Sequence, residues 1–416
     1  MTNLLIEHEC SQCGAPIVLA EDDRLFQCEY CRVISYIFQR DYFRYVLPNT
    51  AMDKQIIFAP YWRFRGMLFS CLSREIIRGF ADFSYRGIES ELFPRSLGLR
   101  SQALKLRFVS PDTEGSFLKP TLPFKEAIRG YRQLLNYSFS KPVSHQAFIG
   151  ETLSLVYSPF HIAPSSRKPN TSQLFDGVLN KPVGLSLEDG DLSLLSSGDR
   201  PDWQISLIPA LCPKCGWNLS GQRDALMLNC ENCQAIWRSD GTRFRELEAA
   251  HISESGKDIA YLPFWRIRAD VSGVRLDSYA DMIRLANLPK VAKNGEDRFR
   301  FYFWVSAFKI RPRIFLTLSS RMTLSQPREE LKAGLPDAPC HPVTLPHTAA
   351  AKSLKIILAS FMKPRKMLSE KIGETELKVK EWLPVYVPFR EKHHEFVQET
   401  YRMAVNKNML KLAENL

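Results

Sequence analysis

Cys10-Ser11-Gln12-Cys13 and Cys28-Glu29-Tyr30-Cys31 are the segments that decide how this chain folds. Each is a Cys-x-x-Cys pair, and fourteen residues separate the two pairs. The same pattern returns further along the chain as Cys212/Cys215 and Cys230/Cys233, again with fourteen residues between the pairs. Identical spacing in two places predicts two small modules of one kind, each beginning one half of the chain.

Cysteine pairs at this spacing are metal ligands more often than disulfides in a reducing compartment. Two tight turns that each present two thiolates supply the four soft ligands that tetrahedral zinc prefers. Gly14 and Gly216 follow the first pairs, where a left-handed residue turns backbone N–H groups toward the sulfurs. Because every position is a cysteine, no coordination site stays open for water, and both sites are predicted to be structural. The predicted cofactor is two zinc ions per chain, with the ligands Cys10, Cys13, Cys28, Cys31, Cys212, Cys215, Cys230 and Cys233.

These modules resemble zinc ribbons of the rubredoxin-like kind, and the resemblance is confined to the ribbon segments. Short strands at Leu25–Gln27 and Met227–Asn229 suit the approach to each second pair. Iron in a rubredoxin-type site is the alternative. Rubredoxins usually carry a glycine after both pairs, whereas Arg32 and Gln234 follow the second pairs here, which favours zinc. The whole chain also loosely resembles uncharacterised bacterial tandem zinc-ribbon proteins, a resemblance that implies no activity.

Five further matches between the two halves predict an internal duplication. They pair Pro60–Arg65 with Pro263–Arg268, Ala103–Arg107 with Ala307–Arg311, Phe139–Pro142 with Phe361–Pro364, Ile149–Thr152 with Ile372–Thr375, and Val156–Phe160 with Val385–Phe389. The halves should then superpose with Trp62 on Trp265 and Gly150 on Gly373. The polar segments Leu187–Asp191 and Ser196–Asp199 predict a linker near residue 200.

Hydrophobic periodicity predicts the α+β fold class, with an antiparallel or mixed sheet in each half. Alternating strands are expected around Trp62, Leu104 and Tyr157. Helical spacing is found at Ala127, Ile128, Tyr131, Leu134 and Leu135, and again at Leu354, Ile356, Ile357 and Phe361. The predicted domains are a ribbon at 1–45, an α+β unit at 46–200, a second ribbon at 201–245 and a second α+β unit at 246–416. The stretch from Phe396 to Leu416 is predicted to be a docking helix without a counterpart in the first half.

The composition is that of a soluble, globular protein. Lysine and arginine number 56 against 45 acidic residues, a formal charge of +11 that falls to about +7 once thiolates and zinc are counted. No apolar run approaches the roughly 18 residues of a membrane span, and the N-terminus does not read as a secretory signal. A cytoplasmic location is therefore expected. The two remaining cysteines, Cys71 and Cys340, are predicted to be buried apolar residues.

The sequence does not point to an enzyme. Neither Gly-rich phosphate-loop pattern occurs, and no Gly-x-Ser-x-Gly elbow is present. His393 and His394 lie near Glu391 and Glu395, but they do not follow the His-Glu-x-x-His pattern and are interpreted as a solvated helix start.

Two functional hypotheses remain open. The first is a non-enzymatic, zinc-stabilised interaction or scaffold protein that presents duplicated docking surfaces to a protein partner. The alternative is nucleic-acid binding by basic sheet faces interleaved with aromatic residues, carried by Arg63 and Arg65, Lys105 and Arg107, and their counterparts Arg266 and Arg268. Glu151 and Glu374, in the repeated Ile-Gly-Glu-Thr segment, are predicted to be ion-pair partners of the strand arginines.

Overall fold

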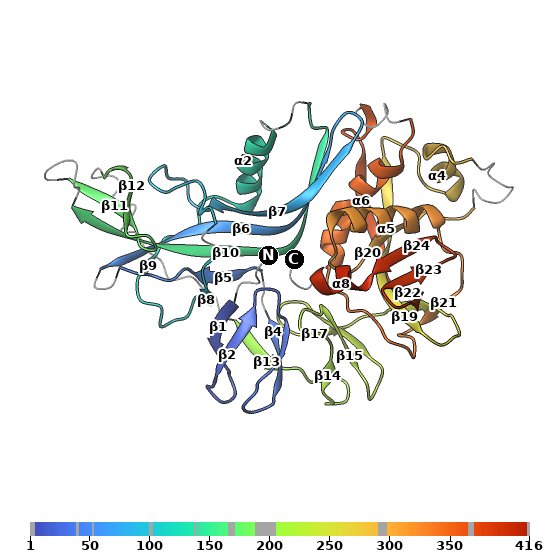
Figure 1. Ribbon diagram of the computed structural model, residues 1–416, viewed down its shortest axis with the longest axis horizontal. Coiled ribbons are helices and arrows are strands. Elements are labelled where there is room, and N and C mark those ends of the chain that lie inside the picture. Colours follow the sequence, from blue (N-terminus) through green and yellow to red (C-terminus); the bar gives the residue numbers. More distant parts are fainter. Residues whose placement is uncertain are drawn as a thin grey trace. The chain divides into compact units, whose positions relative to one another are not determined.

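The computed structural model describes residues 5–38, 41–51, 54–99, 103–136, 139, 141–164, 171–187, 205–289, 298–364 and 370–413 (Figure 1). The chain divides into two compact units. Unit 1 contains Met1–Arg65, Asp82–Ser138 and Thr152–Pro209, and unit 2 contains Gly66–Ala81, Phe139–Glu151 and Ala210–Leu416. Two segments of the first half thus belong to unit 2, so the division is not a single cut near residue 200. The predicted linker from residue 188 onward lies outside the described residues.

Unit 1 is built mainly of strands. They are β1 (Leu5–Glu9), β2 (Pro16–Ala20), β3 (Leu25–Gln27), β4 (Ile34–Phe38), β5 (Phe43–Val46), β6 (Ile56–Cys71), β7 (Ile76–Arg86), β8 (Leu106–Phe108), β9 (Ser116–Phe117), β10 (His145–Pro164), β11 (Ser172–Asp176), β12 (Lys181–Ser186) and β13 (Ser206–Pro209), with helix α2 (Phe124–Asn136). The last residues of β6, the first of β7 and the start of β10 fall in unit 2. The main sheet has the order β12-β11-β10-β5-β8-β1-β2, with β6 pairing β10, β7 and β9. A small second sheet has the order β13-β4-β3.

Unit 2 has the same mixture with more helix. Its elements are β14 (Leu219–Ser220), β15 (Met227–Cys230), β16 (Ile236–Ser239), β17 (Phe244–Glu246), β18 (Ala250–Ile252), β19 (Ile259–Ser272), α4 (Tyr279–Leu285), β20 (Phe303–Ser306), α5 (Pro312–Ser325), β21 (Leu331–Ala333), α6 (His347–Phe361), β22 (Glu376–Glu391), β23 (Glu395–Gln398), β24 (Met403–Asn406) and α8 (Lys407–Ala413). The ribbon strands form the sheet β14-β15-β16-β17, and the larger sheet has the order β20-β19-β22-β18-β21. Among the described residues, no helix is long and apolar enough to cross a membrane.

Both helices predicted from helical spacing are present, and the α+β class is confirmed. Leu354, Ile356 and Ile357 are fully buried in α6, as an apolar stripe against a core requires. The stripe of α2 is less completely covered, because Leu134 is half exposed. The strand around Trp62 differs from expectation in one respect. Almost all of β6 is buried on both faces, so its arginines do not lie on a solvated surface.

The prediction of a C-terminal docking helix from Phe396 to Leu416 is wrong for most of that stretch. Residues 395–406 form the antiparallel hairpin of β23 and β24, and only Lys407–Ala413 is helical. β23 continues the sheet from β22, just as β11 continues it from β10 in unit 1. Buried and exposed residues alternate along β24, since Met403 and Val405 are buried while Ala404 and Asn406 are exposed. That is the period of a strand, not of a helix.

Two of the five sequence matches join segments with different structures. Ile149–Thr152 lies inside β10, whereas the identical residues Ile372–Thr375 form the turn before β22. Gly150 therefore has no structural counterpart in Gly373. Likewise β8 contains Leu106 and Arg107, whereas Ala307–Arg311 is the loop that leads into α5. Short identical stretches take the structure that their tertiary surroundings impose.

A set of hydrogen bonds around Trp62 anchors helix α2 in unit 1. The Trp62 indole Nε1–H donates to the Leu122 carbonyl at 2.7 Å, two residues before the helix begins. Around it, three backbone groups bind their neighbours: Gly87 N–H to the Pro60 carbonyl at 2.7 Å, Leu122 N–H to the Gly87 carbonyl at 3.0 Å, and Glu89 N–H to the Thr121 hydroxyl at 3.0 Å.

The same set occurs around Trp265 at the start of α6 in unit 2. The Trp265 indole donates to the Leu345 carbonyl at 2.8 Å, again two residues before the helix. The three flanking bonds are Ala307 N–H to the Pro263 carbonyl at 3.0 Å, Leu345 N–H to the Ala307 carbonyl at 3.0 Å, and Lys309 N–H to the Thr344 hydroxyl at 2.8 Å. These contacts align Gly87 with Ala307 and Thr121-Leu122-Pro123 with Thr344-Leu345-Pro346.

Candidate functional site

The first four-cysteine cluster is assembled by the ribbon of unit 1. The Sγ atoms of Cys10 and Cys31 lie 3.8 Å apart, and those of Cys13 and Cys28 lie 3.7 Å apart. All four sulfurs lie within 4.8 Å of one another. A tetrahedral zinc ion with bonds of about 2.3 Å holds its sulfurs about 3.8 Å apart. The cluster therefore has the size of a closed metal site, and its donor set suits zinc or iron.

Backbone turns shape each cysteine pair in this ribbon. The Gly14 N–H donates to the Cys10 carbonyl at 2.8 Å, and the Arg32 N–H donates to the Cys28 carbonyl at 2.9 Å. Both donors have left-handed backbone angles, with φ of 70° at Gly14 and 59° at Arg32. Such turns bring the two cysteines of a pair to one side, where their sulfurs converge.

The second cluster repeats this geometry in unit 2. Its Sγ distances are 3.6 Å between Cys212 and Cys233 and 3.4 Å between Cys215 and Cys230. The left-handed positions are Gly216 with φ of 75° and Gln234 with φ of 58°. The left-handed glycines were predicted, whereas the same conformation at Arg32 and Gln234 was not. The equal spacing of the two pairs was the signal, since equivalent turns need equivalent backbone angles.

The cysteines differ in how readily they lose a proton. A hydrogen bond from the Cys31 backbone lowers the pKa of Cys28 to about 7. The side chain of Asn232, followed by the backbone of Trp217, lowers the pKa of Cys215 to about 6. In the same clusters the pKa of Cys13 is raised to about 11 and that of Cys233 to about 12, because a backbone hydrogen bond to each thiol is outweighed by burial and by the neighbouring sulfurs. A thiolate is the species that binds metal. Asn232 is a contributor that the spacing of cysteines could not reveal.

The two remaining cysteines lie apart from both clusters. Cys71 is fully buried, as predicted, and packs in the core of unit 2. Cys340 is partly buried, and burial raises the pKa of its thiol to about 12. A thiol with that pKa is protonated at neutral pH and is a poor nucleophile.

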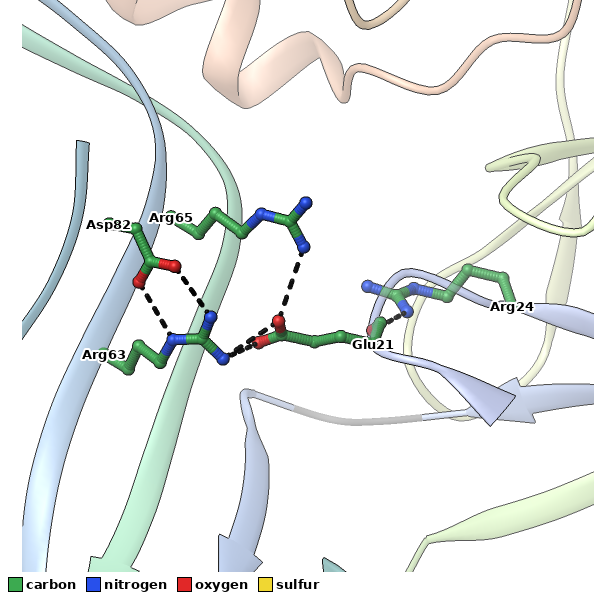
Figure 2. Close-up of polar contacts among 5 residues, drawn as sticks. All are labelled: Glu21, Arg24, Arg63, Arg65 and Asp82. Atoms are coloured by element: carbon green, nitrogen blue, oxygen red, sulfur yellow. Dashed lines mark hydrogen bonds and ion pairs between the residues drawn. The ribbon is translucent and has the colours of Figure 1, made fainter. Parts of the chain in front are cut away.

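Arg63 is the centre of a buried ion-pair network in unit 1 (Figure 2). Its Nε and Nη2 donate to the two carboxylate oxygens of Asp82 at 3.0 and 2.9 Å. Its Nη1 donates to both oxygens of Glu21 at 3.0 Å. Arg65 approaches the same Glu21 carboxylate at 3.6 Å. Glu21 belongs to the turn between β2 and β3, so the ribbon itself supplies a charge to the sheet.

This network explains why basic residues on β6 tolerate burial. Desolvation opposes the charge on Arg63, but the nearby Glu21 and Asp82 outweigh it and raise the pKa of Arg63 above its usual value. A buried guanidinium was predicted to need a carboxylate, and Glu21 and Asp82 meet that need from places far apart in the sequence. The side chain of Glu151 lies outside the described residues, so its pairing stays a prediction.

The predicted pairing of Glu374 is wrong. The register of β19 and β22 places Glu381 opposite Arg268 and Leu383 opposite Arg266. Glu374 lies before β22 begins and is exposed. Arg266 instead stacks its guanidinium over the Tyr302 ring, 3.7 Å from the centroid. In this half the Ile-Gly-Glu-Thr segment precedes β22 and lies outside its strand pairing.

The remaining basic and histidine candidates lie on the surface. Lys105 and Arg107 are exposed and share Glu7, with contacts of 3.1 and 3.4 Å. His393 and His394 lie in the turn between β22 and β23, not at a helix start, with their Nδ1 atoms 3.2 Å apart. Within the described part of the chain, the groups of cysteine, histidine and acidic residues arranged to hold a metal ion are the two four-cysteine clusters.

No family model, no curated protein and no solved structure matches the chain. The two clusters have the spacing and geometry of zinc-ribbon-like modules. Inferences about function therefore depend on the residues and contacts described above.

Proposed function

We propose that this protein is a non-enzymatic interaction protein in which two structural zinc ions hold two ribbons that present docking surfaces to a protein partner. The observation that carries the proposal is the pair of closed four-thiolate clusters. Four cysteines around one point leave no coordination position for substrate or water. Such a site contributes folding free energy, which for a structural zinc ion is on the order of 10 kcal/mol.

The proposal includes an origin of both halves from one duplicated unit. Support comes from the matching hydrogen bonds of Trp62 and Trp265. It also comes from strand pairing, since β5 lies parallel to β10 and antiparallel to β8, and β18 lies parallel to β22 and antiparallel to β21. Under this alignment Leu106-Arg107 corresponds to Leu331-Lys332, replacing the match drawn from sequence alone.

The docking surfaces are proposed at the cysteine turns. Tyr30 lies within the second pair of the first ribbon and is 69% exposed, and Trp217 follows the first pair of the second ribbon and is 58% exposed. Large aromatic side chains are enriched at the centres of protein interfaces and are uncommon on surfaces that stay solvated. The metal holds both turns rigid, so these rings are presented with little conformational entropy to lose on binding.

Two measurements test the proposal. Elemental analysis of the purified chain should give two zinc ions per chain and almost no iron. Affinity purification from the native cell should retain a stoichiometric protein partner with the wild type and lose it with Tyr30→Ala/Trp217→Ala. That variant must keep both zinc ions, and Leu99→Ala/Leu134→Ala, which removes exposed apolar residues outside the ribbons, is the matched control. Iron at stoichiometric levels, or equal partner recovery with both variants, would contradict the proposal.

The alternative of a nucleic-acid-binding sheet face loses support in unit 1. Arg63 and Arg65 are buried and held by carboxylates, so a phosphate backbone does not have access to them. Lys105 and Arg107 are exposed, but both contact Glu7. These contacts belong to unit 1 only. In unit 2, Arg266 on the corresponding strand β19 lies against the Tyr302 ring.

A further inference from the structure

Unit 2 contains a cavity of about 290 Å³ with an unusual concentration of arginine. Its charged lining residues are Arg266, Arg298, Arg300, Arg328 and Glu329, and its aromatic lining residues include Phe299 and Tyr302. We refer to it as the Arg266 pocket. Four guanidinium groups and one carboxylate give its wall a net positive charge, and a cleft lined by charges of one sign concentrates ions of the opposite sign.

Three of these arginines have no acidic partner among the described residues. Arg266, Arg298 and Arg300 form no ion pair with any acid in the part of the chain that the structure describes. Arg266 is half-buried on β19 and rests on the Tyr302 ring, while Arg298 and Arg300 are exposed at the rim. Bringing like charges together without a counterion is unfavourable, and a bound anion is the arrangement that relieves it.

In the first half of the chain, the arginine that corresponds to Arg266 is Arg63, and its charge is neutralised by carboxylates. Arg63 and Arg266 each follow the aligned proline by three residues, and Asp82 and Tyr302 each precede the aligned Gly87 and Ala307 by five. At the strand position where Arg63 meets the Asp82 carboxylate, Arg266 therefore meets an aromatic ring. The second ribbon also lacks an acid at the position of Glu21. Glu21 lies eleven residues after Cys10, and the residue eleven after Cys212 is Arg223.

The wall of the pocket is held in a fixed shape. Gln326 caps α5 in the left-handed conformation, with φ of 44°. Its side-chain Oε1 accepts from the Tyr302 N–H at 3.1 Å, and its Nε2 donates to the Thr323 carbonyl at 2.7 Å. These contacts tie the segment that carries Arg328 to Tyr302, whose ring lies under Arg266. An organised cluster of donors loses less entropy on binding a ligand than a set of free surface side chains does.

The chemistry of the wall indicates the kind of ligand. A single carboxylate is satisfied by one guanidinium, whereas a phosphate offers more charge and more acceptor oxygens and suits several. The pocket also contains an accessible ring, because Phe299 is 49% exposed and Arg328 lies over it at 4.4 Å. Arginine planes and aromatic rings are the surfaces on which nucleobases stack. An adjoining cavity of about 730 Å³ shares Arg328 and Glu329 and adds Arg321 and Arg402, which leaves room for a longer ligand.

We propose that the Arg266 pocket binds the phosphate of a nucleotide, either free or within a single nucleic-acid strand. Arg266, Arg298 and Arg300 hold the phosphate, and the Phe299–Arg328 stack receives the base. Glu329 lies at the boundary with the adjoining cavity and limits how many phosphates the wall accepts. The proposal concerns residues of unit 2 alone and does not depend on the docking role of the ribbons.

The test uses the zinc-loaded full chain and three probes: inorganic phosphate, adenosine monophosphate and a short single-stranded oligothymidylate. Binding is measured at low and at moderate salt. Arg298→Gln/Arg300→Gln removes two exposed charges and should weaken binding about tenfold or more, since each lost contact is a charge-assisted hydrogen bond. For the oligothymidylate, the slope of log affinity against log salt should fall by about one for each phosphate contact removed. Lys105→Gln/Arg107→Gln, which removes two exposed charges at and just before β8, is the matched control and should leave affinity nearly unchanged.

A second variant uses the first half as its template. Tyr302→Asp places an acid where Asp82 stands in unit 1, and it should abolish binding of all three probes while leaving both zinc ions in place. Binding of adenosine monophosphate identifies a free nucleotide as the ligand, and binding of the oligothymidylate alone identifies a strand. Absence of saturable binding to any probe, or equal weakening by the control pair, would overturn the proposal.

Discussion

Arg63 and Asp82 form a bidentate ion pair in the interior of unit 1, with two parallel hydrogen bonds of 3.0 and 2.9 Å. Glu21 completes the arrangement from the ribbon, and its side chain is only 1% exposed. In this network the positive charges of Arg63 and Arg65 are therefore buried together with the negative charges of Glu21 and Asp82. The pairing joins the four-cysteine ribbon to a sheet strand through electrostatics as well as packing.

Replacing Glu21 should lower the free energy of unfolding substantially. Glu21→Gln leaves Arg63 with one carboxylate and Arg65 without the acid it approaches, and loss of one partner from a buried pair costs about 3–5 kcal/mol. Urea unfolding of the zinc-loaded protein measures the change. Glu7→Gln is the matched control, because Glu7 is 40% exposed and contacts Lys105 and Arg107 on the surface. Its loss should cost less than about 1 kcal/mol. Equal costs for the two variants would show that the Arg63 network does not contribute as a buried group.

The indole hydrogen bonds of Trp62 and Trp265 should contribute similar free energies to the stability of their own halves. Trp62→Phe and Trp265→Phe leave the carbonyls of Leu122 and Leu345 without their side-chain donor, an effect worth about 1–3 kcal/mol each. Urea unfolding followed by circular dichroism measures both. Trp217→Phe, at an exposed position, should change stability little. A large cost in one half alone would argue against equivalent roles for the two tryptophans.

The left-handed turns of the second cysteine pairs should accept glycine. A residue with a Cβ pays about 1–2 kcal/mol in this conformation, and glycine avoids that strain at some entropic cost. Gln234→Gly should thus raise stability by about 0.5–1 kcal/mol. Gly216→Ala introduces the opposite strain and should lower it. Thermal unfolding of the zinc-loaded protein compares the two, and a loss of stability in Gln234→Gly would count against the conformational argument.

Stability should fall on acidification through two histidines of unit 2. Burial lowers the pKa of His341 to about 4, and burial followed by the charge of Arg238 does the same for His347. In the unfolded chain a histidine has a pKa of about 6.5. The unfolded state therefore takes up protons first, and the stability present above about pH 6.5 is lost as the pH falls toward 4.

The pH effect is checked by measuring unfolding free energy across this range. His341→Phe, which keeps a ring against Phe308, should flatten the acid limb of the curve. His393→Gln, at the exposed turn between β22 and β23, serves as the control. An unchanged acid limb in His341→Phe would remove this histidine from the explanation.

The sequence alone was sufficient to predict those features that depend on a few neighbouring residues. In each ribbon, two Cys-x-x-Cys pairs determine the four-sulfur cluster, because each pair is a tight turn and the spacing sets how far apart the turns lie. The helices at α2 and α6 followed from apolar residues at helical spacing. The Thr-Leu-Pro repeat before both helices was also present in the sequence and would have aligned the halves better than the Ile-Gly-Glu-Thr segment did.

Tertiary structure decided what depends on residues distant along the chain. The partners of Arg63 come from a ribbon turn and from β7, and the sequence offered no means to choose them over Glu151. The replacement of Asp82 by Tyr302 becomes meaningful only when hydrogen bonds align the two strands. Local patterns determine periodicity and turns, whereas ion pairing and burial are set by the arrangement of strands in three dimensions. The same arginine motif is thus neutralised in one half, while in the other it faces a cavity.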